Sequence, residues 1–387
     1  MIFLIFATIS QLLQNMNHLI NSHHVQSEKC SQFNGKHLIK NIKESRTEIH
    51  KYNSSVVTYN AKSIHRGDNN WLVYIFKNAT ITKNYISTPV EFQKINLRNG
   101  KHDIVGNLIQ NTLHQKNIKT KCLKKTLIVI DYVDYWNWWW VLVATSSHYT
   151  ILLSIADDIE LDDVAVLHLK EDNREKKNYL MPLRNIYYRL FSNKKNIRLN
   201  PKLLNNECYS SIVLLPTREN PSILKNIKHS HDHCISPILK SYKYILMNNF
   251  RISNNIGNKI CWMYRRTKIQ ITSWQKYRII YNQDSIINTL NIVKLDFHGK
   301  VSIHQQFKEI SNCQLLIGAH GAGLNLVIGM RKPVLMELTP GKIMNRNAHN
   351  IITALNGCLY TLDMPFIRLN FNIIQHHIEK VKLKCDL

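Results

Sequence analysis

Residues 315–325 read Leu315-Leu316-Ile317-Gly318-Ala319-His320-Gly321-Ala322-Gly323-Leu324-Asn325. An apolar run leads to His320, and two glycines then flank one alanine. This pattern predicts a buried strand that runs directly into a tight turn and the first turn of a helix. Gly321 and Gly323 are expected to adopt backbone angles closed to other residues, so that main-chain N–H groups approach a ligand closely. A helix N-terminus suits a diphosphate; the alternative is a plain strand-to-helix turn capped by His320.

Further apolar runs along the chain predict buried strands at Thr126–Ile130, Val164–Leu169, Ser211–Leu215, Ile260–Tyr264, Ile292–Leu295, Leu315–Ile317 and Val334–Leu338. Helical patterns lie between or after the later runs, at Ser285–Leu290, His304–Ile310 and Ala348–Leu355. This alternation predicts an α/β fold with a parallel, Rossmann-like sheet in the carboxy-terminal half. A polar stretch at residues 248–257 ends in glycine and favours two domains, 26–245 and 246–387, after a separate segment 1–25. Two α/β domains would create a cleft between them, where ligands preferentially bind.

The composition is that of a globular protein. Of the 387 residues, 44% are hydrophobic and 20% are charged, which argues against disorder. The formal net charge of +25 raises nucleic acid as a partner. The basic residues are spread over the whole length, however, and no nucleic-acid-binding signature occurs among them. We therefore expect no nucleic-acid partner.

The amino terminus begins with the apolar run Met1–Ile9. Its length suits a secretory signal, with membrane association through a truncated anchor, or a terminal helix, as alternatives. Asn53 and Asn78 begin glycosylation tripeptides and agree with a lumenal protein. The eight cysteines form no C-x-x-C pair, which argues against a zinc site and allows up to four disulfides. Cys313 is expected within or at the end of a core helix, as a simple buried thiol.

With these features in view, the carboxy-terminal half resembles glycosyltransferase family 61. Gly318–Leu324 is similar to that family's G-x-H-G-A-G-L signature, and Gln306 lies fourteen residues before His320, as does the family's usual glutamine. Glu337 resembles the glutamate of the next strand. Met263–Arg266 resembles a strand that ends in arginine.

A further mark of the resemblance is the segment Arg278–Asp284, which is similar to the family's R-x-I-x-N-E pattern. Gln283 replaces the usual glutamate there. The resemblance covers about residues 258–365 well and the remainder weakly.

The resemblance implies a GT-B architecture, with two Rossmann-like domains facing a cleft and the donor nucleotide held by the carboxy-terminal one. It implies an inverting transferase of the secretory pathway, in the Golgi or endoplasmic reticulum, that needs neither metal nor cofactor. The donor would be a UDP-sugar carrying xylose or N-acetylglucosamine. The acceptor would be a glycoprotein glycan or a Ser/Thr side chain.

Sugar transfer leaves growing negative charge on the diphosphate, which fixed cations and backbone N–H groups stabilise. The resemblance assigns donor binding to these residues: Arg265, Arg266, Arg278, Asn282, Gln306, His320, Gly321, Ala322, Gly323 and Glu337. Because adjacent strand residues point to opposite faces, only one of Arg265 and Arg266 is expected to face the ligand. For four of the other side chains, a structural role is the simpler alternative to donor binding. His320 would cap the turn, Glu337 would be a surface carboxylate, and Asn282 and Gln306 would bond to the backbone.

An inverting transferase also needs a general base. The family segment tied to this role carries histidine and, four residues later, aspartate; the nearest match here is Asn137–Trp140, with Trp140 and Ala144 in those places. Either another residue is the base, with Asp131, Asp134 and His148 as candidates, or activity is weak or lost.

Two further features near this segment have a functional and a structural interpretation. Trp138, Trp139 and Trp140 either stack on acceptor sugars or fill the core. The acidic run Ala156–Asp163 could suggest a D-x-D metal site. A solvated turn is the preferred interpretation, so no metal is expected.

The leading hypothesis is thus a lumenal glycosyltransferase. His349 and the Gly357–Tyr360 spacing resemble the β-1,2-xylosyltransferase branch, and the branch that modifies EGF-domain Ser or Thr with N-acetylglucosamine stands close behind. The alternative is a catalytically impaired family member that binds a sugar or glycoprotein.

Overall fold

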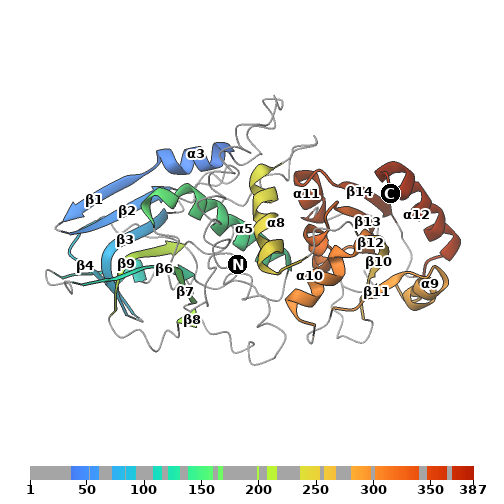
Figure 1. The fold of residues 1–387 in the computed structure, drawn as a ribbon, viewed down its shortest axis with the longest axis horizontal. Coiled ribbons are helices and arrows are strands. Elements are labelled where there is room, and N and C mark those ends of the chain that lie inside the picture. The colour runs from blue at the N-terminus through green and yellow to red at the C-terminus, as the bar shows by residue number, and fades with distance from the viewer. Residues whose placement is uncertain are drawn as a thin grey trace, which may run out of the picture. The chain divides into compact units, whose positions relative to one another are not determined.

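The computed structural model describes residues 36–51, 53–60, 72–82, 84–92, 108–115, 121–130, 138–159, 164–168, 198–199, 207–215, 236–252, 257–266, 280–297, 301–339, 347–363 and 368–387. Two compact units make up the chain. Unit 1 comprises Met1–Asp134, Trp140–Lys176 and Arg184–Asn226, and unit 2 comprises Tyr135–Trp139, Lys177–Leu183 and Ile227–Leu387. Figure 1 labels their helices and strands. The boundary expected at residues 245–246 lies inside a helix of unit 2, α8 (Pro237–Asn249).

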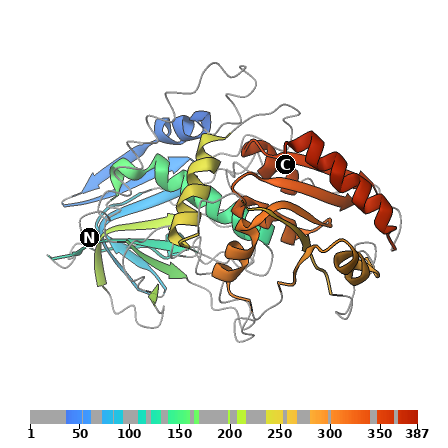
Figure 2. The same cartoon turned by 45° about the vertical axis from the view of Figure 1, so that its right-hand side comes forward.

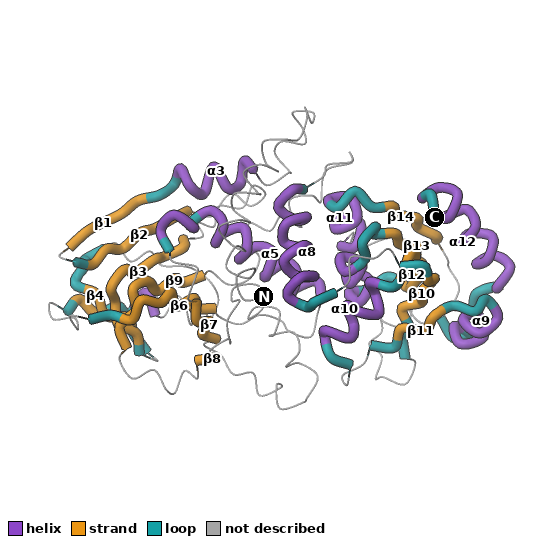
Figure 3. Tube along the Cα trace, in the orientation of Figure 1, coloured by secondary structure: helices purple, strands orange, loops and turns teal. Residues whose placement is uncertain are grey.

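Unit 1 is built on a nine-stranded mixed sheet (Figure 3). Its main path runs β1-β2-β3-β9-β6-β7-β8; off this path, β4 pairs with β3, and β5 pairs with β4. The strands are β1 (Thr47–Lys51), β2 (Ser54–Asn60), β3 (Leu72–Ile81), β4 (Ile86–Thr88), β5 (Leu113–His114), β6 (Leu123–Ile130), β7 (Val164–His168), β8 (Arg198–Leu199) and β9 (Glu207–Leu215).

The sheet of unit 1 is not the parallel sheet that was expected of a second Rossmann-like domain, because part of it is antiparallel. Antiparallel pairing joins β1, β2, β3 and β9, whereas parallel pairing joins β9, β6, β7 and β8. The predicted strands at 126–130, 164–169 and 211–215 are confirmed as β6, β7 and β9. The strands β1, β2 and β3 were not predicted; β1 is short and largely polar, and Lys77 and Asn78 interrupt the apolar pattern of β3.

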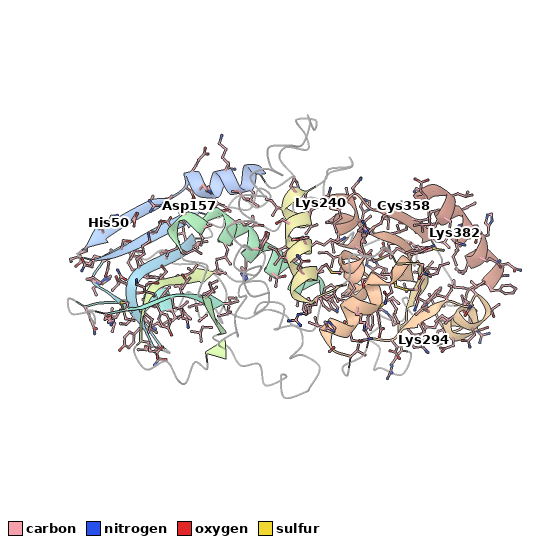
Figure 4. All side chains as sticks on the ribbon, in the orientation of Figure 1. His50, Asp157, Lys240, Lys294, Cys358 and Lys382 are labelled. Atoms are coloured by element: carbon pink, nitrogen blue, oxygen red, sulfur yellow. A yellow bond between two sulfur atoms is a disulfide. The ribbon has the colours of Figure 1, made fainter. Side chains whose placement is uncertain are left out.

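The helices of unit 1 are α3 (Lys36–Glu44), most of α5 (Trp138–Ser154) and the short η1 (Ala156–Asp158). The acidic end of η1 is not the fully solvated turn that was expected. Asp158 accepts bonds from Arg46 Nε at 2.8 Å, Lys77 Nζ at 3.1 Å and the Tyr59 hydroxyl, and its side chain is 8% exposed. Its neighbour Asp157, labelled in Figure 4, is 82% exposed. Asp158 is therefore a structural residue of unit 1, whereas Asp157 is a surface charge.

Unit 2 contains the predicted parallel sheet, in the order β11-β10-β12-β13-β14. Its strands are β10 (Lys259–Met263), β11 (Val293–Leu295), β12 (Cys313–Ala319), β13 (Val334–Thr339) and β14 (Cys358–Asp363). Its helices besides α8 are α9 (Gln283–Thr289), α10 (Ile303–Ser311), η6 (Ala322–Gly329), α11 (Asn347–Ala354) and α12 (Phe371–Cys385). The predicted strands and helices of this half are confirmed.

Helices cover both faces of this sheet. Figures 1 and 2 show α9 and α12 on one side of it and α10 and α11 on the other. Alternate residues of the central strands join the core under α9 and α12: Leu315, Ile317, Val334 and Met336. The intervening residues point to the opposite face because strand side chains alternate. This double burial explains why β12 and β13 are almost wholly apolar.

Two of these helices, α10 and α12, have a side-chain cap at their start and one apolar stripe. Ser302 accepts a bond from Gln305 N at the start of α10, and Ile303, Phe307 and Ile310 are buried at helical spacing. Asn370 likewise caps α12, which buries Ile374, Ile378, Val381 and Cys385.

Three disulfides link described cysteines: Cys122–Cys208, Cys261–Cys313 and Cys358–Cys385. The expectation that Cys313 is a buried thiol in a helix is wrong, since Cys313 begins β12 and is bonded to Cys261 of β10. Cys358 (Figure 4) ties β14 to the last residue of α12. Cys30 and Cys234 lie outside the described residues.

The two predicted glycosylation sites differ in setting. Asn53 is exposed in the turn between β1 and β2. Asn78 lies within β3 with a φ of 51°, and its Nδ2 donates to Asn53 O at 2.6 Å. The segment 1–25 lies outside the described residues. Across the described helices, none combines the length and apolarity that a membrane crossing requires.

Candidate active site

The glycine-flanked turn lies at the carboxyl end of a central strand of unit 2. β12 ends at Ala319, and His320 N still donates to Leu338 O of the neighbouring strand at 2.9 Å. Gly321 then leads into the expected helix, which is the 3-10 helix η6. The first bond of η6 runs from Leu324 N to Gly321 O at 3.1 Å. The N–H groups of Ala322 and Gly323 precede that bond, as the first donors of any helix do.

His320 is paired with the carboxylate of the adjacent strand. Its Nδ1 lies 2.7 Å from Glu337 Oε1, and the two side chains are only 12% and 5% exposed. Glu337 is therefore not the surface carboxylate that the simpler interpretation expected. A carboxylate at Nδ1 orients the imidazole and leaves Nε2 as the nitrogen that can meet a ligand.

Arg265 lies over the glycine turn. Its Nη2 donates to His320 O at 3.4 Å, and a Cβ added to Gly321 would be 2.0 Å from that nitrogen. A side chain at residue 321 would fit only if the Arg265 guanidinium moved. The backbone itself does not require glycine, because Gly321 has an extended φ of 165°. A Cβ on Gly323 would make only ordinary contact with Met263 at 3.5 Å, and the φ of Gly323 also lies outside the left-handed region, so neither glycine has the backbone angles that were expected.

The side chain of the adjacent Arg266 has a different partner. It forms an ion pair with Asp296 at 2.8 Å, and its side chain is 44% exposed. Both arginines follow the last residue of β10, yet their side chains have different surroundings. Arg265 is thus the arginine beside the turn. Arg278 lies outside the described residues.

The amides expected to contact the donor bond instead to the backbone. Asn282 Nδ2 donates to Leu369 O at 2.6 Å, and its Oδ1 accepts from Leu369 N at 3.0 Å. Gln306 Nε2 donates to Val301 O at 3.0 Å. These contacts agree with the simpler interpretation, in which both residues stabilise loops.

A pocket of about 140 Å³ lies beside Arg265 and the turn. Its lining residues all belong to unit 2 and are Trp138, Met263, Tyr264, Arg265, Phe297, Ala319, Gly323, Leu324 and Leu326. Trp138 also packs edge-on against Phe307, with ring centroids 5.6 Å apart. The sequence did not indicate Tyr264 or Phe297 as site residues, because an aromatic residue after a strand forms no distinctive sequence pattern.

The expected base and acceptor residues are only partly described. Trp138, Trp139 and Trp140 begin α5, so Trp140, Ala144 and His148 share one helix face. His148 is 2% exposed, and this burial argues against its contact with an acceptor. Asp131 and Asp134 lie outside the described residues, as do the side chains of Trp139 and Trp140. Within the described ranges, no three His, Cys, Asp or Glu side chains come together as a metal site would require.

Comparison with known proteins adds one finding to this geometry. Residues 162–336 match the family model described as Glycosyltransferase 61, and this span includes β7, β9, β10, β12 and the turn after His320. No curated protein matches the chain. The match over residues 162–336 confirms the resemblance seen in the sequence and supports membership of the chain in glycosyltransferase family 61.

Proposed function

We propose that the chain is an inverting, metal-independent glycosyltransferase that takes its sugar from a UDP-sugar. Family membership supports the transferase class. The observation that carries the finer proposal is the placement of the Arg265 guanidinium against Gly321, beside the His320–Glu337 pair. A diphosphate bound here would meet a fixed cation and a run of backbone N–H groups.

This arrangement suits the chemistry of the leaving group. Cleavage of the sugar–phosphate bond sends an electron pair and negative charge to the diphosphate. Arg265 and the N–H groups of Ala322 and Gly323 are preorganised donors for that charge. The Glu337 carboxylate holds the His320 imidazole through Nδ1 and leaves Nε2 available to the donor.

The aromatic pocket next to the turn would hold a ring of the donor. Trp138, Tyr264 and Phe297 offer apolar faces for stacking, and Arg265 joins the pocket to the diphosphate position. Nucleotide sugars combine a flat base, a sugar and a diphosphate, so this pairing of an aromatic wall with a cation supports such a donor.

The acceptor, the compartment and the overall architecture belong to the same proposal. A glycoprotein acceptor, a Golgi or endoplasmic-reticulum lumen and a GT-B architecture are what the family resemblance implies. The three disulfides support an oxidising lumen. A base supplied by a residue outside the described ranges, such as Asp131 or Asp134, completes the proposal.

The direct test is transfer by the purified full chain from UDP-xylose and from UDP-N-acetylglucosamine, each with and without EDTA. We expect transfer from one donor, insensitive to EDTA, and UDP binding in a calorimeter. Absence of both UDP binding and transfer from either donor would overturn the proposal. Loss of transfer in EDTA would overturn its metal-independent part.

One observation favours a second function, that of a catalytically impaired sugar- or glycoprotein-binding relative. Trp140 and Ala144 stand where the resembling segment of the family carries histidine and aspartate, one helical turn apart on α5. In this case the chain would bind UDP and glycan but transfer no sugar. Saturable UDP binding without turnover of any donor would decide for this function.

A further inference from the structure

Gln283 is a buried polar residue at the start of α9, with 2% of its surface exposed. Its side-chain amide faces the backbone of Arg265 and makes two bonds to it. Arg265 N donates to Gln283 Oε1 at 3.3 Å, and Gln283 Nε2 donates to Arg265 O at 2.6 Å. An amide can make this two-way contact because it carries both a donor and an acceptor.

These two bonds lie just beyond the last residue of β10 that pairs with the neighbouring strands. The pairing of β10 with β11 and with β12 ends at Met263, and Tyr264 N makes one more bond, to Leu295 O at 2.9 Å. Arg265 is the next residue along the chain. Gln283 therefore binds the backbone of Arg265 in the manner of a neighbouring strand.

The position of that backbone decides where the guanidinium lies. Arg265 Nη2 is 3.4 Å from His320 O, and it occupies the space that a Cβ on residue 321 would need. A shift of the Arg265 backbone would thus carry the cation away from the turn. Misplacement of a charged group by about 1 Å can cost on the order of 100-fold in binding or rate.

We propose that Gln283 is a positioning residue, which fixes the main chain of Arg265 so that its guanidinium meets the diphosphate of the donor. This inference rests on the proposed function. It also gives a physical meaning to a departure from the family pattern, which carries glutamate at this place. A glutamate carboxylate could accept from Arg265 N but could not donate to Arg265 O.

The experiment measures UDP affinity of the full chain by calorimetry, together with Tm. Gln283→Met keeps the side-chain length and removes both bonds; we expect affinity to fall about 10- to 100-fold. Asn370→Ala is the matched control in the same unit, since it removes an amide that caps α12. It should lower Tm with less than about a twofold change in affinity.

A double-mutant cycle separates positioning from general destabilisation. If Gln283 acts through Arg265, then Gln283→Met should add no further loss of UDP affinity to Arg265→Ala. Gln283→Glu, which keeps one of the two bonds, should fall between wild type and Gln283→Met. Gln283→Glu also tests the inference if the Gln283→Met variant does not fold.

The outcomes distinguish the inference from the function on which it rests. UDP affinity of Gln283→Met or Gln283→Glu equal to that of wild type would overturn the inference alone. So would losses that simply add in the double variant. A wild-type chain that binds no UDP would overturn the proposed function, and the role of Gln283 with it.

Discussion

His320 Nδ1 lies 2.7 Å from Glu337 Oε1, so a residue just past the end of one strand of unit 2 is paired with a residue inside the neighbouring parallel strand. His320 follows β12 directly, whereas Glu337 lies within β13, opposite Gly318 in the strand register. The pair therefore joins the glycine turn to the sheet that carries it. Its burial makes each partner costly to remove.

Glu337→Gln tests whether the charge of this pair matters for the donor. The variant keeps the size of the side chain and an acceptor for His320 Nδ1 but removes the carboxylate. We expect UDP affinity to fall about tenfold, since a charge-assisted bond is roughly twice as strong as a neutral one. Calorimetry and a thermal melt measure affinity and Tm. A variant with wild-type affinity at unchanged Tm would show that the charge has no role in donor binding.

Gly321→Ala should displace Arg265 without unfolding the chain. The added Cβ would be 2.0 Å from Arg265 Nη2, and this atom is the far end of a flexible side chain. We expect at least about a tenfold loss of UDP affinity and a Tm change of only a few degrees. Gly323→Ala, whose Cβ would meet Met263 at 3.5 Å, should lose clearly less affinity. Equal effects of the two variants would contradict the assigned role of Arg265.

Asp158→Asn should destabilise unit 1 in a pH-dependent way. Donation from Arg46 holds the pKa of Asp158 well below its usual range. A carboxyl whose folded pKa is depressed adds stability above its unfolded pKa and loses it as the pH falls through the folded value. We expect a cost of about 3 kcal/mol at pH 7, which shrinks below about pH 4.

Denaturant unfolding of wild type and variant across pH 2–7 measures this difference. Asp157→Asn is the control on the neighbouring residue. Its side chain is 82% exposed and pairs only at the surface with Lys43, so we expect a cost below about 1 kcal/mol. A pH-independent cost of Asp158→Asn would exclude its charge as the cause.

Lys243→Met should change the alkaline stability of unit 2. Lys243 Nζ donates to Met330 O and, at 3.1 Å, to Arg331 O, and burial lowers its pKa to about 8. Between about pH 8 and pH 10 the unfolded chain therefore binds a proton that the folded chain has released. Wild-type stability should rise with pH in this window, relative to Lys243→Met, by at most about 1.4 kcal/mol per pH unit. Unfolding curves that keep a constant separation from pH 7 to 10 would contradict the shifted pKa.

Much of unit 2 could be predicted because its elements are marked locally. The runs around Leu315–Ile317 and Val334–Leu338 are apolar on both faces, and a strand covered by helices on both sides needs that pattern. The helix at His304–Ile310 has an N-cap serine and one apolar stripe. Unit 1 was harder to predict, since its sheet depends on pairing between distant segments; β3 pairs antiparallel with β9, about 140 residues away.

The sequence by itself determined that residues 315–325 form a strand and a glycine turn, because apolar patterning and glycine content act over a few neighbouring residues. It also showed the resemblance to glycosyltransferase family 61, because the motif letters stand in order along the chain. Only the tertiary structure decided that Arg265, and not Arg266, lies on Gly321, that Glu337 pairs with His320, and that Gln283 holds the Arg265 backbone. These choices depend on which side chains meet across separate strands and helices, and such contacts leave no local pattern in the sequence.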